Sequence, residues 1–89
     1  MPEQTITIIN KLGLHARAAA KLVQLAAGYD ADISVTKDGK TVNGKSIMGV
    51  MMLAAAQGSE LSIATEGPDA DEAMAGLTEL INDRFGEGQ

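Results

Sequence analysis

The segment DISVTKDGKTVN, residues 32–43, decides the fold that we expect for this chain. Apolar and polar side chains alternate over 32–37, a pattern typical of a strand with one buried face. Asp38-Gly39 is a two-residue hairpin signal, and strand-like residues return in 40–43. Because a tight hairpin joins antiparallel neighbours, the sheet around this segment should be mainly antiparallel.

The flanking segments predict two more strands and three helices. The further strands, 4–9 and 60–66, alternate in the same way. The helical segments are rich in Ala, Leu and Met, and we expect helices over Ala16–Ala27, from Ile47 to about Ala55, and from Ala70 to about Phe85. The residues expected to face the core are apolar at helical spacing: Ala19, Leu22, Val23 and Ala26 in the first helix, and Ala70, Ala73, Met74, Leu77, Leu80 and Ile81 in the last.

The helix ends carry recognisable signals. Ser46 is a suitable N-cap for the second helix. Asp69 with Glu72 three residues later predicts a capping box at the start of the last helix. Gly28 and Gly86 are natural stops for the first and last helices.

The element order is therefore β-α-β-β-α-β-α, which we assign to one α+β domain spanning residues 1–89. We expect a four-stranded sheet with the helices packed on one face. A domain of this size buries only about 60 to 65 % of the surface that its unfolded chain exposes. One core is expected, without a deep cavity for a large cofactor.

Composition excludes several classes of protein. The net charge of −5 and the scarcity of aromatic residues, Tyr29 and Phe85, argue against a nucleic-acid partner. With no cysteine and one histidine, we expect no disulfide, no metal site and no cofactor. We find neither a signal peptide nor a membrane-spanning segment, so a cytoplasmic protein is expected.

The charges are unevenly distributed along the chain. Residues 60–89 hold eight acids and one base, whereas 4–29 and 39–59 hold no acid at all. The acid-free segments carry five bases: Lys11, Arg17, Lys21, Lys40 and Lys45. This asymmetry is either chance in a short chain or a sign that an anion binds there.

The stretch GKTVNGKS, residues 39–46, fits the phosphate-binding P-loop formula G-x-x-x-x-G-K-[ST]. Thr41 and Val42 are β-branched and follow the hairpin turn, so we expect them in a paired strand. A P-loop domain also needs a wide parallel sheet and an acid that holds magnesium, for which this chain is too short. We therefore do not expect a nucleotide site.

Ser46, at the end of that stretch, has two interpretations. It is a plain capping serine, or it is a regulatory phosphorylation site. A phosphate at this position would meet the positive end of the helix dipole and the neighbouring Lys45.

A second candidate phosphate site is LGLHARAAAKL, residues 12–22. His15 lies at or next to the N-cap of the first helix, where the backbone amides of Ala16 and Arg17 can bind an anion. Arg17 opposes the helix dipole, and an anion beside it would explain its position. A neutral imidazole is a nucleophile, so a phosphoryl group on His15 would be held by these groups. The simpler alternative is a solvated histidine beside a solvated arginine.

Two motifs, GLHARAAAKLV (13–23) and NGKSIMGVMMLAA (43–55), occur in this β-α-β-β-α-β-α order. Together they resemble the histidine-containing phosphocarrier (HPr) family of the bacterial phosphoenolpyruvate-dependent phosphotransferase system. The resemblance covers about residues 4–85. It implies an open-faced β-sandwich with an antiparallel sheet of order 1-4-2-3.

The resemblance also implies roles for individual residues. His15 would accept a phosphoryl group on Nδ1 from enzyme I and pass it to an enzyme IIA-type domain, with Arg17 stabilising the phosphoryl charge. Ser46 matches the serine that a dedicated ATP-dependent serine kinase/phosphorylase modifies where that kinase exists. The matching partner-docking positions are Ala20, Lys21, Gln24, Ile47, Met48, Met51 and Met52.

Some questions stay open at this point. Ala18 stands where the family commonly has proline, and Leu12 where it often has a small polar residue. The NKLG…HAR start and the tail INDRFGEG, 81–88, are similar to the nitrogen-related branch, but they do not decide between nitrogen regulation and sugar uptake. A regulatory binding module controlled through Ser46, without relay duty, is the alternative function. We expect a monomer.

Overall fold

The hairpin between β2 (Asp32–Lys37) and β3 (Lys40–Asn43) forms as the sequence predicts in the computed structural model, which describes residues 3–86. Asp38 and Gly39 have φ angles of 51° and 82°. Positive φ at both central residues is what a type I′ turn requires, and its twist matches that of the flanking strands. The turn residues therefore set the antiparallel register of this pair.

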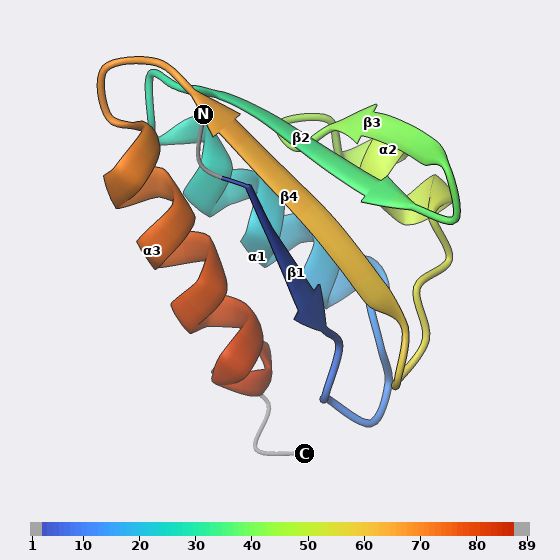
Figure 1. Ribbon diagram of the computed structural model, residues 1–89. Helices are drawn as coiled ribbons and strands as arrows, with labels where there is room; N and C mark the ends of the chain where they lie inside the picture. Colours follow the sequence, from blue (N-terminus) through green and yellow to red (C-terminus); the bar gives the residue numbers. More distant parts are fainter. Residues whose placement is uncertain (1–2, 87–89) are drawn as a thin grey trace.

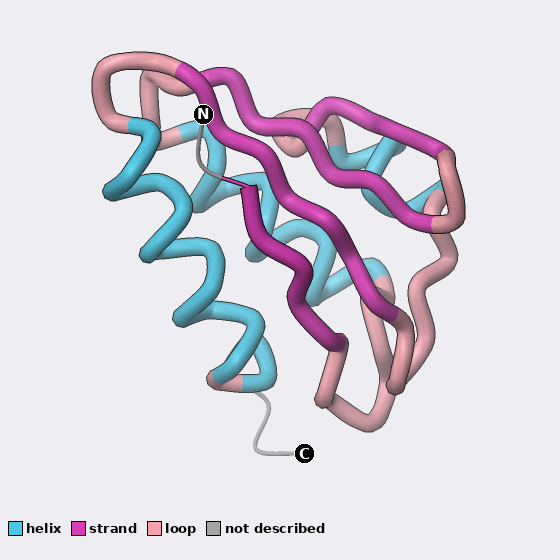
Figure 2. The backbone as a smooth tube through the Cα atoms, viewed as in Figure 1, coloured by secondary structure: helices cyan, strands magenta, loops and turns pink. Residues whose placement is uncertain are grey.

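The complete sheet has the order β1-β4-β2-β3, and every neighbouring pair is antiparallel. β4 (Glu60–Glu66) lies between β1 (Glu3–Thr7) and β2 (Figure 1). Three helices lie on one face of this sheet (Figures 1 and 2): α1 (Ala16–Ala27), α2 (Ile47–Met52) and α3 (Ala70–Asn82). The predicted α+β fold, an open-faced β-sandwich of order 1-4-2-3, is confirmed.

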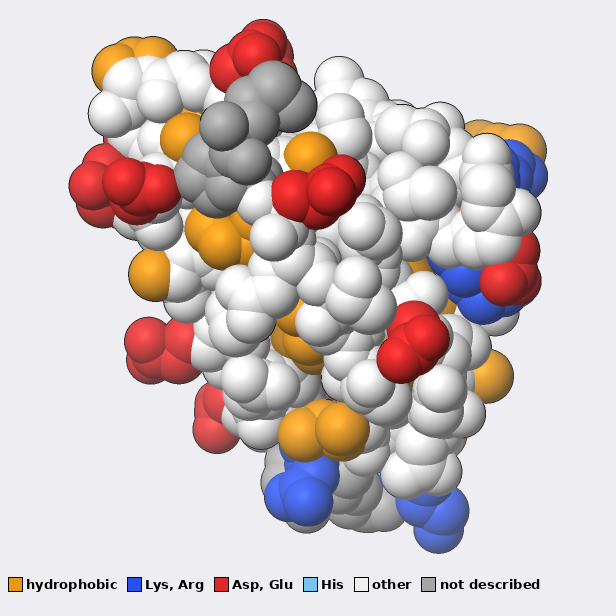
Figure 3. All heavy atoms as spheres, viewed as in Figure 1, with side chains coloured by type: hydrophobic (Ala, Val, Ile, Leu, Met, Phe, Trp, Pro, Cys, Tyr) orange, Lys and Arg blue, Asp and Glu red, His pale blue; other side chains and the backbone are white. Residues whose placement is uncertain are grey.

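The other face of the sheet is open. Figure 3 shows this face, on which uncharged polar side chains and backbone dominate, with scattered acidic and hydrophobic groups and basic groups at its edges. The alternation along β4 explains the difference between the faces, since Leu61 and Ile63 are buried while Ser62 and Ala64 are half-buried. The sheet thus contributes apolar side chains to one core, between itself and the helices.

The helices complete that core with the faces that the sequence predicts. Ala19, Leu22 and Ala26 of α1 are buried, and Val23 is half-buried. Ala18 is also fully buried, which the sequence analysis did not predict. In α3 the expected residues are buried apart from Leu80, which is half-buried: Ala70, Ala73, Met74, Leu77 and Ile81.

Three elements end earlier than predicted: β1, α2 and α3. β1 ends at Thr7, although Ile8 still exchanges backbone hydrogen bonds with the loop before β4, donating to Ser59 and accepting from Gly58, both at 2.8 Å. α2 ends at Met52 because Ala54 has a left-handed φ of 51°. These breaks let the chain turn while its apolar residues still reach the core.

The capping box predicted for Asp69 and Glu72 is wrong. The Asp69 side chain makes no capping bond to α3, and its two oxygens instead accept the backbone N–H groups of Asp30 and Ala31 at 2.9 and 2.8 Å. Asp30 and Ala31 lie in the loop before β2. The Asp69 carboxylate, which has two strong acceptor oxygens, therefore joins the start of α3 to that loop. Gly28 also ends α1 without the left-handed φ of a glycine cap, with φ −78°.

The last helix ends differently as well. α3 stops at Asn82, and a short 3-10 turn follows over Arg84–Gly86. Phe85 takes a left-handed φ of 55° and is fully buried. Burial of the aromatic ring offsets the strained backbone, which sequence propensity alone does not predict. The part of the tail INDRFGEG beyond Gly86 lies outside the described residues.

Candidate functional site

His15 is the N-cap of α1, as the sequence predicts. Its backbone is extended, with φ −76° and ψ 180°, and its carbonyl accepts the Ala19 N–H at 2.8 Å. Its Nδ1 accepts the backbone N–H of Arg17 at 3.2 Å. The imidazole thus takes the place that an N-cap oxygen usually occupies, and Nδ1 points at the positive end of the helix.

The accepted hydrogen bond defines the chemical state of the ring. A nitrogen that accepts an N–H bond carries a lone pair, so the proton of a neutral imidazole sits on Nε2. His15 is half-buried, and Ala16 and Arg17 are exposed residues at the same end of the helix. The imidazole of His15, the first amides of α1 and the cationic residue Arg17 therefore lie at one accessible end of the helix.

The loop before His15 is held rigidly. Gly13 has φ +68°, and a Cβ built on it would lie 2.6 Å from the Ala55 carbonyl oxygen. The Leu14 N–H donates to that same oxygen at 2.7 Å, and the Leu14 side chain is buried. Only glycine tolerates this combination of conformation and close approach.

Asn10 is a supporting residue that the sequence analysis missed. It is fully buried, and its Nδ2 donates to the Gly13 carbonyl oxygen at 2.7 Å. An asparagine that begins a tight turn three residues before a glycine is the sequence signal that would have found it. Together with Leu14, it fixes the path of the chain into α1.

The absence of acids at the start of α1 agrees with the sequence analysis. The first turn of α1 contains no acidic residue, and Arg17 is its cation. A cation at this end opposes the helix dipole by a few tenths to about 1 kcal/mol. The site is therefore suited electrostatically to an anion rather than to a metal ion. Among residues 3–86, no cluster of three or more histidines or acids is placed to hold a metal.

Ser46 is the N-cap of α2, also as predicted. Its Oγ accepts the Gly49 N–H at 3.1 Å, and its carbonyl accepts the Val50 N–H at 3.0 Å. The neighbouring Lys45 is engaged elsewhere, because its Nζ donates to the Tyr29 carbonyl oxygen at 2.8 Å. Lys45 thus ties the end of α1 to the loop before α2.

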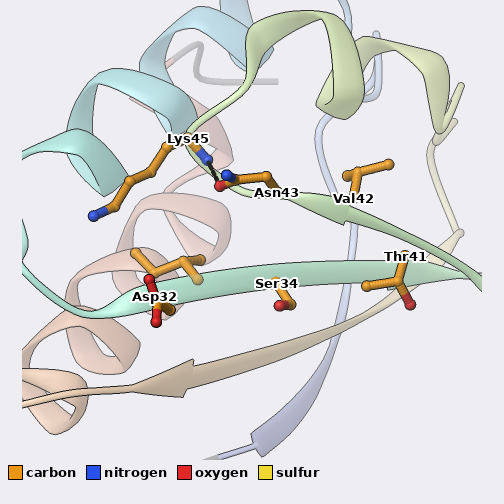
Figure 4. Close-up of a pocket in the computed structure, with 7 residues that line it drawn as sticks. Asp32, Ser34, Thr41, Val42, Asn43 and Lys45 are labelled. Atoms are coloured by element: carbon orange, nitrogen blue, oxygen red, sulfur yellow. Dashed lines mark hydrogen bonds between the residues drawn. The ribbon is translucent and has the colours of Figure 1, made fainter.

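The P-loop-like stretch forms no phosphate cradle. Thr41 and Val42 pair with Thr36 and Val35 across the hairpin, so their backbone groups belong to the sheet. A shallow hollow of about 360 Å³ lies along this hairpin (Figure 4), lined by Asp32, Ile33, Ser34, Thr41, Val42, Asn43 and Lys45. In it the Lys45 backbone N–H donates to Asn43 Oδ1 at 2.8 Å. The lining includes neither His15 nor Ser46.

Most of the large apolar side chains that are exposed among the described residues lie on α2, and one lies in the loop before His15. The large hydrophobic residues that are exposed in the described part of the chain are Leu12, Ile47, Met48, Met51 and Met52. Four of them belong to α2, and Leu12 belongs to the loop before His15. The Leu14–Ala55 hydrogen bond joins that loop to the segment that follows α2. Val50 of α2 and Leu53, the residue after it, are buried as expected.

The residues expected on the neighbouring face of α1 are less uniform. Gln24 is exposed, whereas Ala20 and Lys21 are half-buried. The Lys21 Nζ donates to the Phe85 carbonyl oxygen at 2.6 Å, so this amine holds the 3-10 turn after α3. Sequence reasoning did not anticipate this structural role.

Comparison with known proteins assigns this combination of fold and site to a class. The family model described as "PTS HPr component phosphorylation site" matches residues 2–83. Phosphocarrier protein HPr of Neisseria meningitidis serogroup A is 56% identical over 89 residues, which cover 100% of both chains. HPr of Cupriavidus necator is 55% identical over the same length and with the same coverage. The chain therefore belongs to the HPr family of phosphocarrier proteins.

Solved structures of HPr proteins have the same fold as this chain. A crystal structure of HPr-C-His from Thermoanaerobacter tengcongensis superposes with a TM-score of 0.95 at 50% identity, covering 98% of each chain. An HPr dimer from the same organism superposes with a TM-score of 0.79, also at 50% identity, covering 98% of this chain and 100% of that one. Over the described residues of this protein, no helix is both long and apolar enough to span a membrane.

Proposed function

We propose that this protein relays a phosphoryl group through His15 within the phosphotransferase system. The Nδ1 lone pair attacks the phosphorus of a phosphohistidine on enzyme I. A new N–P bond forms at His15 as the N–P bond of the donor breaks, and the donor imidazole leaves with the electron pair. The same exchange then moves the group to a histidine of an enzyme IIA-type domain. Membership of the HPr family supports these partners.

One observation carries the proposal: Nδ1 of His15 faces the backbone N–H of Arg17 at the N-terminus of α1. A phosphoryl group on Nδ1 would occupy the space in front of that amide, so its oxygens can accept the N–H bonds of Ala16 and Arg17. The guanidinium of Arg17, which is exposed and on the first turn, can swing onto the same oxygens. The phosphorylated state then gains the helix-dipole interaction that an acid-free first turn leaves unused.

Partner docking is assigned to the exposed apolar face of α2 and the adjoining face of α1. Ile47, Met48, Met51 and Met52 supply the apolar part of this surface, and Ala20, Lys21 and Gln24 lie on the adjoining face of α1. Methionine side chains repack easily, so one surface can fit both a donor and an acceptor protein. The Lys21 amine also has a structural role, because it donates a hydrogen bond to the Phe85 carbonyl oxygen.

Regulation at Ser46 is the second part of the proposal. An HPr serine kinase/phosphorylase would transfer the γ-phosphoryl group of ATP to Ser46 Oγ, with ADP as the leaving group. That oxygen is the N-cap of α2, is half-buried and already accepts the Gly49 N–H. The phosphate would add about two negative charges at the edge of the apolar docking surface and so weaken docking. A regulatory module that acts through Ser46 alone is the competing function, and it assigns no use to His15.

The relay is tested by labelling with purified enzyme I and radioactive phosphoenolpyruvate. We expect the wild-type chain to acquire an acid-labile, base-stable phosphate, the behaviour of a phosphohistidine. His15→Ala should lose the label completely, because no second histidine exists. Ser46→Ala serves as the matched control and should be labelled like the wild type. Label that persists in His15→Ala, or no label in the wild type, would contradict the relay.

The cellular setting completes the proposal. We place the protein in the cytoplasm, with the remaining choice between sugar uptake and nitrogen-related regulation set by which enzyme IIA-type domain accepts the phosphate. The expectation of a monomer stays a prediction, and a solved relative is described as a dimer. Measuring phosphate transfer from labelled protein to purified acceptors of each branch distinguishes the two circuits.

A further inference from the structure

Three methionines share one exposed face of α2. Met48, Met51 and Met52 follow the i, i+3, i+4 spacing that places side chains side by side on a helix. Their exposed fractions are 70%, 42% and 61%, whereas Met74 in α3 is only 7% exposed. Within residues 3–86 there is therefore one group of accessible thioethers and one buried thioether of the same chemical type.

Accessibility decides which of these sulfurs can react. A peroxide oxidises a thioether when the sulfur attacks one oxygen and the O–O bond breaks. The attacked oxygen stays on sulfur and gives its proton to the other oxygen, which leaves as water from hydrogen peroxide or as an alcohol from a hydroperoxide. The sulfur becomes a sulfoxide, oxidised by two electrons, and the peroxide is reduced by the same two. No other group of the protein gains or loses a proton in this step. This step needs direct contact between sulfur and oxidant, which packing denies to Met74.

The change of polarity falls on the docking surface. Methionine sulfoxide is polar and chiral, whereas the thioether is flexible and apolar. The affected side chains already lie in water, so oxidation should leave the fold intact. A partner that covers them must instead desolvate new S=O groups, which weakens binding when these groups find no hydrogen-bond donor.

We propose that Met48, Met51 and Met52 form a redox-sensitive modification site, at which hydrogen peroxide and related hydroperoxides produce sulfoxides that weaken recognition by enzyme I. This inference rests on the proposed docking role of α2. It gives the methionines a function beyond adaptable packing, since an apolar surface of Leu or Ile would dock without responding to oxidants. Methionine sulfoxide reductases make the modification reversible.

The first measurement is the order of oxidation. Purified protein is treated with graded hydrogen peroxide and digested, and each methionine-containing peptide is quantified by mass spectrometry. Met48 and Met52 should oxidise first, Met51 next, and Met74 about ten-fold more slowly, since its sulfur becomes accessible only through local opening. Equal rates for Met74 and Met48 would overturn the inference.

The second measurement is the consequence for transfer. The KM of enzyme I for the oxidised chain should rise about ten-fold, because an unpaired polar group in an apolar contact weakens binding by roughly that factor. The kcat and the melting temperature should change little. Reductase treatment should restore the original KM. An unchanged KM after full oxidation of α2 would reject the proposal.

Two variants separate the contributions, each compared with its own untreated sample. The triple variant Met48→Leu, Met51→Leu, Met52→Leu should show no peroxide-dependent change in KM, whatever its starting value. Met74→Leu should respond to peroxide like the wild type. Equal inhibition of the triple variant would place the sensitive group elsewhere and overturn the assignment. Failure of the untreated wild type to accept phosphate on His15 would instead reject the relay itself.

Discussion

At the scale of single residues, the histidine site depends on close packing that leaves few alternatives. Gly13 has a left-handed backbone and lies against the Ala55 carbonyl. The side chain of the buried Asn10 donates a hydrogen bond to the Gly13 carbonyl oxygen. The sequence predicts His15, Arg17 and Ser46 as site residues, because each is a polar or charged residue at a helix start, and the structure places all three at the starts of α1 and α2. The sequence does not reveal Asn10, whose importance comes from burial in a loop that local propensity describes only as a turn.

Gly13→Ala tests this packing. We expect the free energy of unfolding to fall by about 3 kcal/mol or more, because the new Cβ meets backbone atoms that cannot move aside. Labelling of His15 should also slow. Gly58→Ala is the matched control, since its φ is +92° but its added Cβ meets nothing within 4 Å. That variant should lose only about 1–2 kcal/mol from backbone strain alone. Equal losses in the two urea titrations would disprove the packing argument.

At the scale of elements, the strands and helices follow the sequence closely, while their ends follow tertiary contacts. α1, β2, β3 and β4 have the bounds that periodicity and turn signals predict. α2 and α3 end early, because Ala54 and Phe85 adopt left-handed conformations that serve the core rather than the helix. Such residues have no local preference for these conformations, so no sequence pattern announces them.

Asp69 illustrates the same lesson in its side chain. The pattern with Glu72 indicates a capping box, but the carboxylate instead holds the N–H groups of Asp30 and Ala31. The two amide donors that Asp69 binds lie 39 and 38 residues away from it in the sequence. Local rules weigh only nearby donors, so they cannot rank a local cap against distant amides.

The role of Asp69 can be measured by substitution. Asp69→Ala should lower the free energy of unfolding by about 1–3 kcal/mol, because two amide donors lose their charged acceptor. Asp69→Asn keeps one acceptor oxygen and should lose less. Asp71→Ala, on the first turn of the same helix, should cost no more than about 1 kcal/mol. If Asp71→Ala proves as damaging as Asp69→Ala in thermal unfolding, Asp69 acts only through the helix dipole.

At the scale of the whole molecule, stability depends on a small core with few large side chains. Phe85 and Tyr29 are the aromatic residues of the chain, and Phe85 is fully buried beside α1 and α3. The Lys21 amine bonds to the carbonyl of the same residue, which joins the end of the chain to α1. The turn after α3 thus supplies the fully buried aromatic ring of the core, and Tyr29 packs against that core half-buried.

Phe85→Ala should therefore be severe. Emptying a buried aromatic site costs about 3–5 kcal/mol, and a domain of this size has only about 5–15 kcal/mol in total. Leu80→Ala, at a half-buried position of α3, should cost about 1–2 kcal/mol. Chemical denaturation of both variants compares them directly. A Phe85→Ala variant no less stable than Leu80→Ala would show that the ring contributes little to the core.

The hydrogen bond between Leu14 and the Ala55 carbonyl has one more consequence. This bond, of 2.7 Å, holds the loop that carries the imidazole against the segment that follows α2. If partners dock on α2 as proposed, each of them would meet Nδ1 of His15 at the same offset, whatever its own architecture. Unrelated partners can therefore use the same relative placement of their own phosphohistidine or acceptor histidine and His15.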